Sequence, residues 1–136
     1  MRNVFLMSFI ALSLCACIAV GAATLGAVTY YKSAKHEVAT VNINATPDNI
    51  YRVALQTIKS NSLLKVVSQD EKNHLIELTK GDLSASLKVF RVDPQVSQLL
   101  ITSEINADRS TRLVLDGVFR ICQQLKVDCT LVVDGS

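Results

Sequence analysis

The sequence predicts one α+β domain, in which a strand and a helix precede an antiparallel meander of about four strands and a final helix. Both helices are expected to pack on one face of the sheet. Three observations support this fold class. Segments in which apolar and polar residues alternate, as in half-buried strands, fill the middle of the chain. A segment with apolar residues at helical spacing lies on each side of them. Short turn-forming segments separate neighbouring strands, which favours antiparallel pairing.

The domain is expected to begin at about residue 36, with a strand and then a helix. In residues 41–45, three apolar side chains alternate with two asparagines, the pattern of a strand with one buried face. The helix follows at Thr46, whose hydroxyl suits a cap. Pro47 fits the first helical position, and Asp48 complements the positive end of the helix dipole. The apolar face of this helix consists of Ile50, Val53, Ala54 and Ile58.

Four further strands and a second helix are expected in the rest of the domain. The strands are predicted at residues 63–68, 74–79, 83–89 and 99–105, with turns at 69–73, 80–82 and 93–95. The last helix is expected to begin near Asp108 or Ser110. Its apolar stripe consists of Leu115, Val118, Phe119, Cys122 and Leu125.

Composition limits the classes of protein to which the chain can belong. The 136 residues include 14 basic and 12 acidic side chains, and the basic ones are scattered rather than clustered. Nucleic-acid binding is therefore not expected. Residues 4–31 contain no charged side chain, so the apolar excess of the composition is local to the N-terminal segment.

The first residues have the features of a secretory signal. A short positive start at Met1-Arg2-Asn3 precedes the apolar run Val4 to Leu14. Leu14-Cys15-Ala16-Cys17 then resembles a bacterial lipobox. The resemblance implies cleavage after Ala16 and acylation of Cys17 by chains such as palmitate.

This interpretation divides the chain into three parts and gives it a location. Residues 1–16 are the lipoprotein signal peptide, 17–35 a lipid-anchored Gly/Ala-rich linker, and 36–136 the single α+β domain. The protein is expected at the cell membrane or outer membrane, held by its lipid, with the domain facing the periplasm. Ile18 after Cys17, by resemblance to enterobacterial sorting signals, favours the outer membrane.

An uncleaved membrane helix without lipidation remains the alternative. Val4 to Tyr31 is long enough to cross a bilayer, although glycines and threonines dilute its second half. Tyr30 and Tyr31 stand where aromatic residues favour the boundary between membrane and water.

These features together resemble a family of small, uncharacterised bacterial lipoproteins. The residues that carry the likeness are Ala16-Cys17, the Gly21-to-Gly26 segment, Tyr30-Tyr31, the Thr46-to-Ile58 helix and the Asp108-to-Leu125 helix. The likeness covers most of the chain, and the tail after Leu125 departs from it. The family supplies no catalytic residues.

No group of residues indicates catalysis, a cofactor or a metal site. His36 and His74 are interpreted as surface histidines without a ligand partner, and no HExxH, GxSxG or CxxC motif is present. The chain is therefore not expected to be an enzyme. Cys122 and Cys129 either form a disulfide, if the chain turns back near Val127-Asp128, or remain reduced.

Two functions remain open for the anchored domain. The first is a non-catalytic module that binds an envelope protein or assists assembly, which calls for an apolar patch or an open strand edge. The alternative is a small carrier of a hydrophobic ligand such as a lipid, which needs a cavity of about a few hundred Å³. Leu99, Leu100, Phe90 and Phe119 are its candidate lining residues, although a packed core explains them better.

Overall fold

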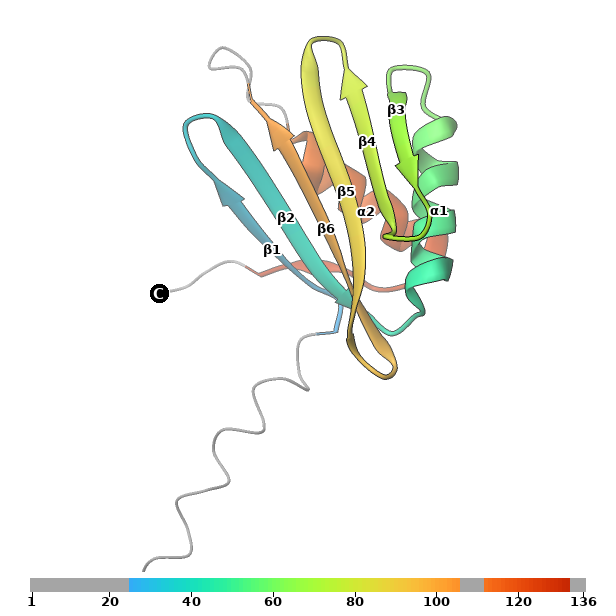
Figure 1. The fold of residues 1–136 in the computed structure, drawn as a ribbon. Coiled ribbons are helices and arrows are strands. Elements are labelled where there is room, and N and C mark those ends of the chain that lie inside the picture. The colour runs from blue at the N-terminus through green and yellow to red at the C-terminus, as the bar shows by residue number, and fades with distance from the viewer. Residues whose placement is uncertain (1–24, 106–111, 133–136) are drawn as a thin grey trace, which may run out of the picture.

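The computed structural model describes residues 25–105 and 112–132 (Figure 1). The predicted signal peptide, the lipidation site Cys17 and the predicted start of the second helix at Asp108 or Ser110 lie outside these residues. The described part contains seven strands and two helices. In chain order they are β1 (Ala27–Lys32), β2 (His36–Ile43), α1 (Pro47–Lys59), β3 (Lys65–Asp70), β4 (Leu75–Lys80), β5 (Leu83–Asp93), β6 (Val96–Glu104), α2 (Leu113–Leu125) and β7 (Thr130–Leu131).

The strands form one mixed sheet in the order β3-β4-β5-β6-β2-β1-β7. Neighbouring strands are antiparallel except β1 and β7, which are parallel. The predicted architecture of one strand, a meander of about four strands and two helices on one face is therefore wrong. The sheet has two further strands, and they come from the two ends of the described chain.

The first of these strands, β1, lies within the range predicted to be a linker. Val28 of β1 pairs with Val41 of β2, and Tyr30 pairs with Ala39. Val28 is fully buried. The segment was not recognised as a strand because the apolar residues before it hide any alternation between a buried and an exposed face.

Local sequence explains the first helix. The Thr46 hydroxyl accepts a hydrogen bond from the Asn49 backbone N–H at 3.2 Å, and Pro47 occupies the first turn. This confirms the predicted cap. Ile50, Ala54 and Ile58 are buried on one face of α1, as their spacing predicts.

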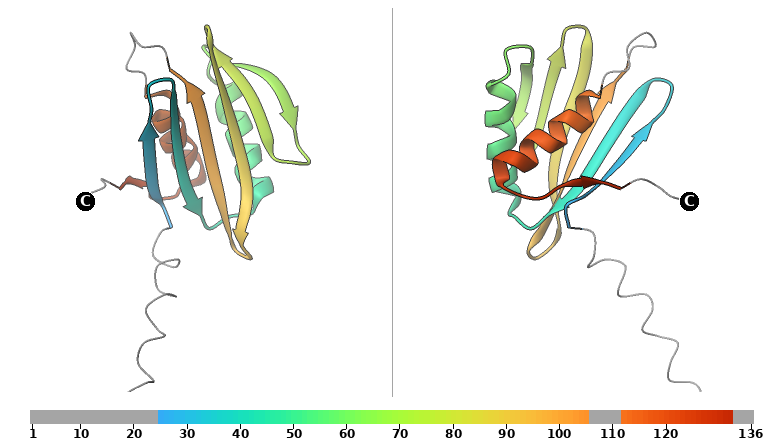
Figure 2. Two further views of the ribbon diagram at one scale, coloured as in Figure 1. Left: turned by 60° about the vertical axis from the view of Figure 1, so that its left-hand side comes forward. Right: turned by 180° about the vertical axis from the view of Figure 1, so that it is seen from behind.

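The core lies between the sheet and the helices. Helix α1 contacts β3, β5 and β6, whereas α2 contacts β2 and β6, and the helices also contact each other. Seen from behind, α2 crosses the sheet and α1 lies at the side where β3 ends it (Figure 2). None of the helices in this described part is long and apolar enough to span a membrane.

The end of the chain returns to its beginning. After α2, Lys126 adopts a left-handed conformation with φ of 59°, and the chain reverses. Cys122 and Cys129 are joined by a disulfide with their Cα atoms 6.2 Å apart. Thr130 then pairs with Ala27, and Leu131 pairs with Val28. The disulfide thus holds the tail at the point where β7 joins β1.

Candidate functional site

A groove of about 350 Å³ opens between α1, α2 and the sheet. Its floor is apolar and comes from three strands, through Leu78 of β4, Leu87 of β5 and Ile101 of β6. Ile58 of α1 and Ile121 of α2 form its apolar walls. Both helices contact β6, and α1 also contacts β5, so the apolar floor between the helices is largely buried, with Leu87 1% exposed. The other lining residues are Thr57, Asn61, Leu64, Lys80, Ala85, Arg112, Leu113, Asp116, Gly117 and Arg120.

Gly117 keeps the α2 wall of the groove thin. A Cβ built at this position lies 3.4 Å from the Ile101 Cδ1 atom, and no other atom within 4 Å restricts it. A glycine in the middle of a helix costs about 0.5–1 kcal/mol relative to alanine. No positive φ angle or backbone clash requires glycine here. The absence of a side chain at Gly117 therefore leaves volume to the groove.

Charged side chains surround the apolar floor. Lys80, Arg112 and Arg120 are basic, and Asp116 is the acidic residue of the lining, which gives the groove a formal charge of +2. Arg112, Asp116 and Arg120 are exposed, and Lys80 is partly buried. The groove therefore offers an apolar interior with a positive rim.

A buried carboxylate positions the start of the α2 wall. The Glu37 side chain is fully buried on β2. One of its oxygens accepts a hydrogen bond from the Val114 backbone N–H at 3.1 Å, and the other accepts one from the Tyr30 hydroxyl at 2.7 Å. Helix α2 has no cap from its own Arg112, so Glu37 supplies the acceptor that the first turn needs.

The same contact changes the acidity of Tyr30. Burial raises the pKa of its hydroxyl to about 12, and the hydrogen bond to Glu37 and the nearby negative charge act in the same direction. The sequence signal for this contact is a charged residue on the buried face of a strand. Glu37 falls on the same alternating face as Ala39 and Val41, where a charged residue needs a buried partner.

The two predicted surface histidines differ in their surroundings. His36 is exposed at the start of β2. His74 is 22% exposed, and its Nε2 atom lies 2.6 Å from an Asp48 carboxylate oxygen. Its ring meets the Tyr51 ring edge-on, with centroids 5.7 Å apart. His74 therefore packs against α1 and is only partly exposed, in contrast to the predicted surface position.

Tyr51 is buried, yet its hydroxyl has no hydrogen-bond partner among the described residues. Burial raises the pKa of the Tyr51 hydroxyl, and the negative charges of Glu71 and Asp70 add to this effect. Asp48 is 88% exposed, so water reaches the His74–Asp48 contact. The contacts of His74 with Asp48 and Tyr51 hold the β3–β4 turn against α1. None of these three described residues is a serine or cysteine that the imidazole could activate as a nucleophile.

A second depression, of about 410 Å³, lies toward the open face of the sheet and is more exposed to solvent. Hydroxyl groups line much of it, and the Ser86 and Thr102 hydroxyls already hydrogen-bond each other at 2.7 Å. Glu77 and Glu104 also line it. It lacks the apolar floor of the groove.

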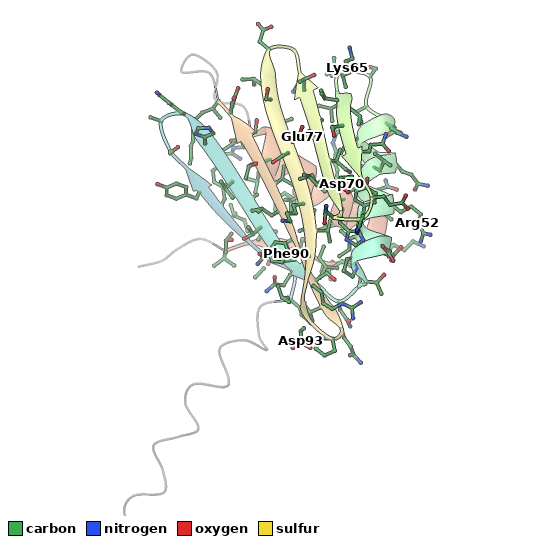
Figure 3. All side chains as sticks on the ribbon, in the orientation of Figure 1. Arg52, Lys65, Asp70, Glu77, Phe90 and Asp93 are labelled. Atoms are coloured by element: carbon green, nitrogen blue, oxygen red, sulfur yellow. A yellow bond between two sulfur atoms is a disulfide. The ribbon has the colours of Figure 1, made fainter. Side chains whose placement is uncertain are left out.

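None of the four predicted lining residues lines the groove. Leu99 is fully buried in the core, and Phe119 packs against that core. Leu100 and Phe90 follow buried neighbours on their strands and so lie on the opposite face. Phe90 is labelled in Figure 3. The prediction chose large apolar residues by type. The groove instead lies where α1, α2 and three strands meet, and residue type alone does not indicate that place.

The described residues show no group of three or more His, Cys, Asp or Glu side chains able to hold a metal ion.

Comparison with known proteins gives little further information. No protein-family model matches the chain, and no curated protein matches it by sequence. A conserved protein of unknown function, EF2215 from Enterococcus faecalis, aligns with a TM-score of 0.48 and 12% identity, over 73% of this chain and 74% of that chain. The Zhui aromatase/cyclase from Streptomyces sp. R1128 aligns with a TM-score of 0.41 and 12% identity, over 67% of this chain and 86% of that chain. Both scores are low, so neither likeness carries an argument about function.

Proposed function

We propose that this chain is a lipid-anchored envelope protein whose domain carries a small hydrophobic ligand in the groove between α1, α2 and the sheet. The groove is the observation that supports the carrier. Its volume of about 350 Å³ falls within the range of about 300–1,000 Å³ typical of small-ligand sites. Burial of an apolar chain on its floor is favourable by about 0.8 kcal/mol for each methylene.

The surface of the domain supports a protein-binding module less well. Its exposed large apolar residues are Leu25, Tyr31, Leu63, Val67, Val92, Leu131 and Val132. Four of them, Leu25, Tyr31, Leu131 and Val132, lie on or beside β1 and β7 at one edge of the sheet, and the other three lie in or before β3 and near the end of β5. This edge is the alternative site for a protein partner, which needs an apolar patch or an open strand edge, whereas a carrier needs an enclosed site such as the groove.

The polar groups of the groove also do not support catalysis. Thr57 is the hydroxyl-bearing residue of the lining, and its hydroxyl donates to the Val53 carbonyl at 2.8 Å. No histidine or cysteine is among the lining residues. A groove that binds without reacting is the simpler function for this set of side chains.

The anchor rests on the N-terminal sequence. A basic Arg2, an apolar run and the pattern Leu14-Cys15-Ala16-Cys17 support acylation of Cys17 at the envelope membrane. Only eight positions separate Cys17 from the first described residue, Leu25. An extended segment of that length spans at most about 30 Å, so an acylated Cys17 would keep the groove close to the lipid surface.

Photolabelling of the full chain in phospholipid nanodiscs tests the carrier function. The probe is a neutral long-chain alcohol that bears a diazirine on its alkyl chain, and labelled peptides are mapped by mass spectrometry. We expect labels within residues 57–64 and 112–121, which line the groove. Gly117→Leu places a side chain in the groove and should reduce this labelling by about tenfold, the effect of about 1.4 kcal/mol.

Gln123→Leu is the matched control, because Gln123 is an exposed α2 residue outside the groove lining. This variant should label as the wild type does. Thermal unfolding of both variants establishes that each is folded. Labels confined to other segments, or equal labelling of the Gly117→Leu variant, would contradict the carrier function.

A further inference from the structure

We propose that the ligand of the groove is a single-chain fatty acid, whose alkyl chain lies on the apolar floor and whose carboxylate is held by the basic rim. This inference rests on the proposed carrier function and specifies its ligand. The choice of a fatty acid depends on the basic residues of the rim, whereas the carrier function requires only the apolar floor. Three basic side chains and one acidic side chain surround one apolar floor.

The positive charge of the protein is concentrated at this groove. The whole chain holds 14 basic and 12 acidic residues, for a net charge of +2. The groove lining takes three of the basic residues and one of the acidic residues. The remaining basic and acidic residues are therefore equal in number. The formal charges of the groove lining thus sum to +2, whereas those of the other residues of the sequence sum to zero.

The rim cations have no ionic partner among residues 25–105 and 112–132. The ion pair that this part of the chain contains joins His74 to Asp48, away from the groove. Arg112, which directly precedes α2, and Arg120 each lie four positions from Asp116, yet neither forms an ion pair with it. Guanidinium groups bind carboxylates through two parallel hydrogen bonds, so free arginines at an apolar groove suit an anionic head group.

The size of the groove favours one alkyl chain over two. A volume of about 350 Å³ is at the low end of the range of about 300–1,000 Å³ for small-ligand sites. The lining residues of α2 run from Leu113 to Ile121, eight residue steps or about 12 Å along the helix axis. Such a groove suits a chain with a compact head group better than a diacyl lipid.

Competition against the neutral photolabel tests this ligand in the full chain in nanodiscs. The competitors are tetradecanoate, tetradecanol and a tetradecanoyl lysophosphatidate. Comparing variants with the same competitor cancels the partition of that competitor into the nanodisc. Tetradecanoate and tetradecanol should both compete, because the apolar floor accepts the same chain from each.

Removing rim cations should weaken only the anionic competitor. The triple variant Lys80→Gln, Arg112→Gln, Arg120→Gln should raise the half-effective concentration of tetradecanoate by about tenfold or more, as expected for loss of charge-assisted hydrogen bonds. Tetradecanol should change by less than about twofold in the same variant, because it carries no charge. The three single variants identify the cation that contributes most.

Asp116→Asn should act in the opposite direction. It removes the one acidic residue of the lining, so tetradecanoate should compete about twofold to threefold better, the size of a modest surface charge effect. Lys88→Gln is the matched control. Lys88 is an exposed β5 residue on the face away from the helices, and its loss should leave all three competitors unchanged.

Each contrary result has its own meaning. If the triple variant changes tetradecanoate and tetradecanol equally, the fatty-acid assignment is wrong while the carrier function stands. If lysophosphatidate competes about tenfold better than tetradecanoate and depends on the same cations, the head group is a phosphate and the assignment is again wrong. If neither the fatty acid nor the alcohol competes, both proposals fail.

Discussion

Gly26 lies where the beginning and the end of the described chain meet. Its φ angle is +77°, and a Cβ at this position would lie 2.2 Å from the Asp128 carbonyl oxygen. The Gly26 N–H donates to the Asn42 carbonyl, and its own carbonyl accepts from the Thr130 N–H, both at 2.9 Å. Any side chain here must displace backbone that is held on both sides.

Gly26→Ala should therefore lower the free energy of unfolding by more than the conformation alone explains. A left-handed conformation costs a non-glycine residue about 1–2 kcal/mol. Gly81→Ala supplies the control, because Gly81 has a φ angle of +60° and nothing within 4 Å of its Cβ position. Urea unfolding of the two variants measures the difference. Equal decreases in the free energy of unfolding of the two variants would show that the Asp128 backbone moves away from the added methyl group without loss of stability.

Gly117 presents the reverse case, because its φ angle is not positive and the Ile101 side chain, rather than backbone, lies 3.4 Å from its Cβ position. Gly117→Ala should raise the free energy of unfolding by up to about 1 kcal/mol through helix propensity. The same methyl group enters the groove near Ile101 and should weaken photolabelling there. Urea unfolding and labelling of one sample check both effects. A loss of stability would mean that the methyl group strains the α2 wall.

Tyr30 should make stability depend on pH in the alkaline range. Its pKa is raised from the ordinary 10.0 to about 12 in the folded protein, so the folded state favours the neutral hydroxyl. This contribution is complete below pH 10 and is lost as the pH rises from 10 to 12. Denaturant unfolding across this range should show a smaller decline in Tyr30→Phe than in the wild type. An identical decline in both proteins would assign it to other groups, Tyr51 among them.

At the scale of elements, sequence patterns predict those helices and strands whose boundaries depend on residues close together in the chain. Thr46 and Pro47 mark the beginning of α1 correctly because capping involves residues only three positions apart. The alternation in residues 83–89 marks β5 because one face of that strand is buried. The first turn of α2 is different. Its acceptor is Glu37, which lies 77 positions away from Val114, and no local pattern predicts that pairing.

Strands β1 and β7 show the limit of such patterns. Strand β1 follows an apolar segment that resembles a linker, so its boundary with that segment is not visible in the sequence. Strand β7 has two residues and exists because β1 is available to pair with it. Both strands depend on a partner distant in sequence, and for that reason the sheet was predicted with too few strands.

The disulfide determines whether β7 stays in place. A loop closed by cysteines seven positions apart contributes about 2–3 kcal/mol in the chain-entropy model. Cys129→Ala should remove that contribution while it leaves the buried Cys122 in the core. Hydrogen exchange of the Thr130 and Val132 amides, which donate to the Gly26 and Val28 carbonyls, should accelerate in this variant. Unchanged protection of these amides would show that β7 holds without the disulfide.

At the scale of the whole molecule, the groove is the feature that no sequence pattern predicts. Its lining combines residues from α1, β4, β5, β6 and α2, and each of them looks like an ordinary core or surface position in its own segment. What makes the groove is the distance between two helices, which the whole fold determines. The sequence does predict what distinguishes a carrier from other functions: a carrier requires a cavity, and a fully packed interface between sheet and helices would exclude a carrier.

The proposed anchor is also a property of the whole chain, and mass spectrometry of the membrane fraction tests it. The wild type should have the mass of residues 17–136 plus acyl groups, whereas Cys17→Ala should lose those groups. Growth of both strains under the same conditions controls for expression. An unmodified full-length mass in both samples would instead indicate the uncleaved membrane helix that the sequence leaves open.

The position of β1 between β2 and β7 has a consequence for a chain that emerges N-terminus first from a ribosome or a translocation channel. The groove lining ends at Ile121 within α2, so all of its residues precede β7 in the chain. The outer edge of β1 stays bare until Thr130 and Leu131 have followed. A chain that lacks those residues exposes an unpaired strand edge, which invites pairing with other chains. Strand β7 thereby protects the edge of β1 against aggregation.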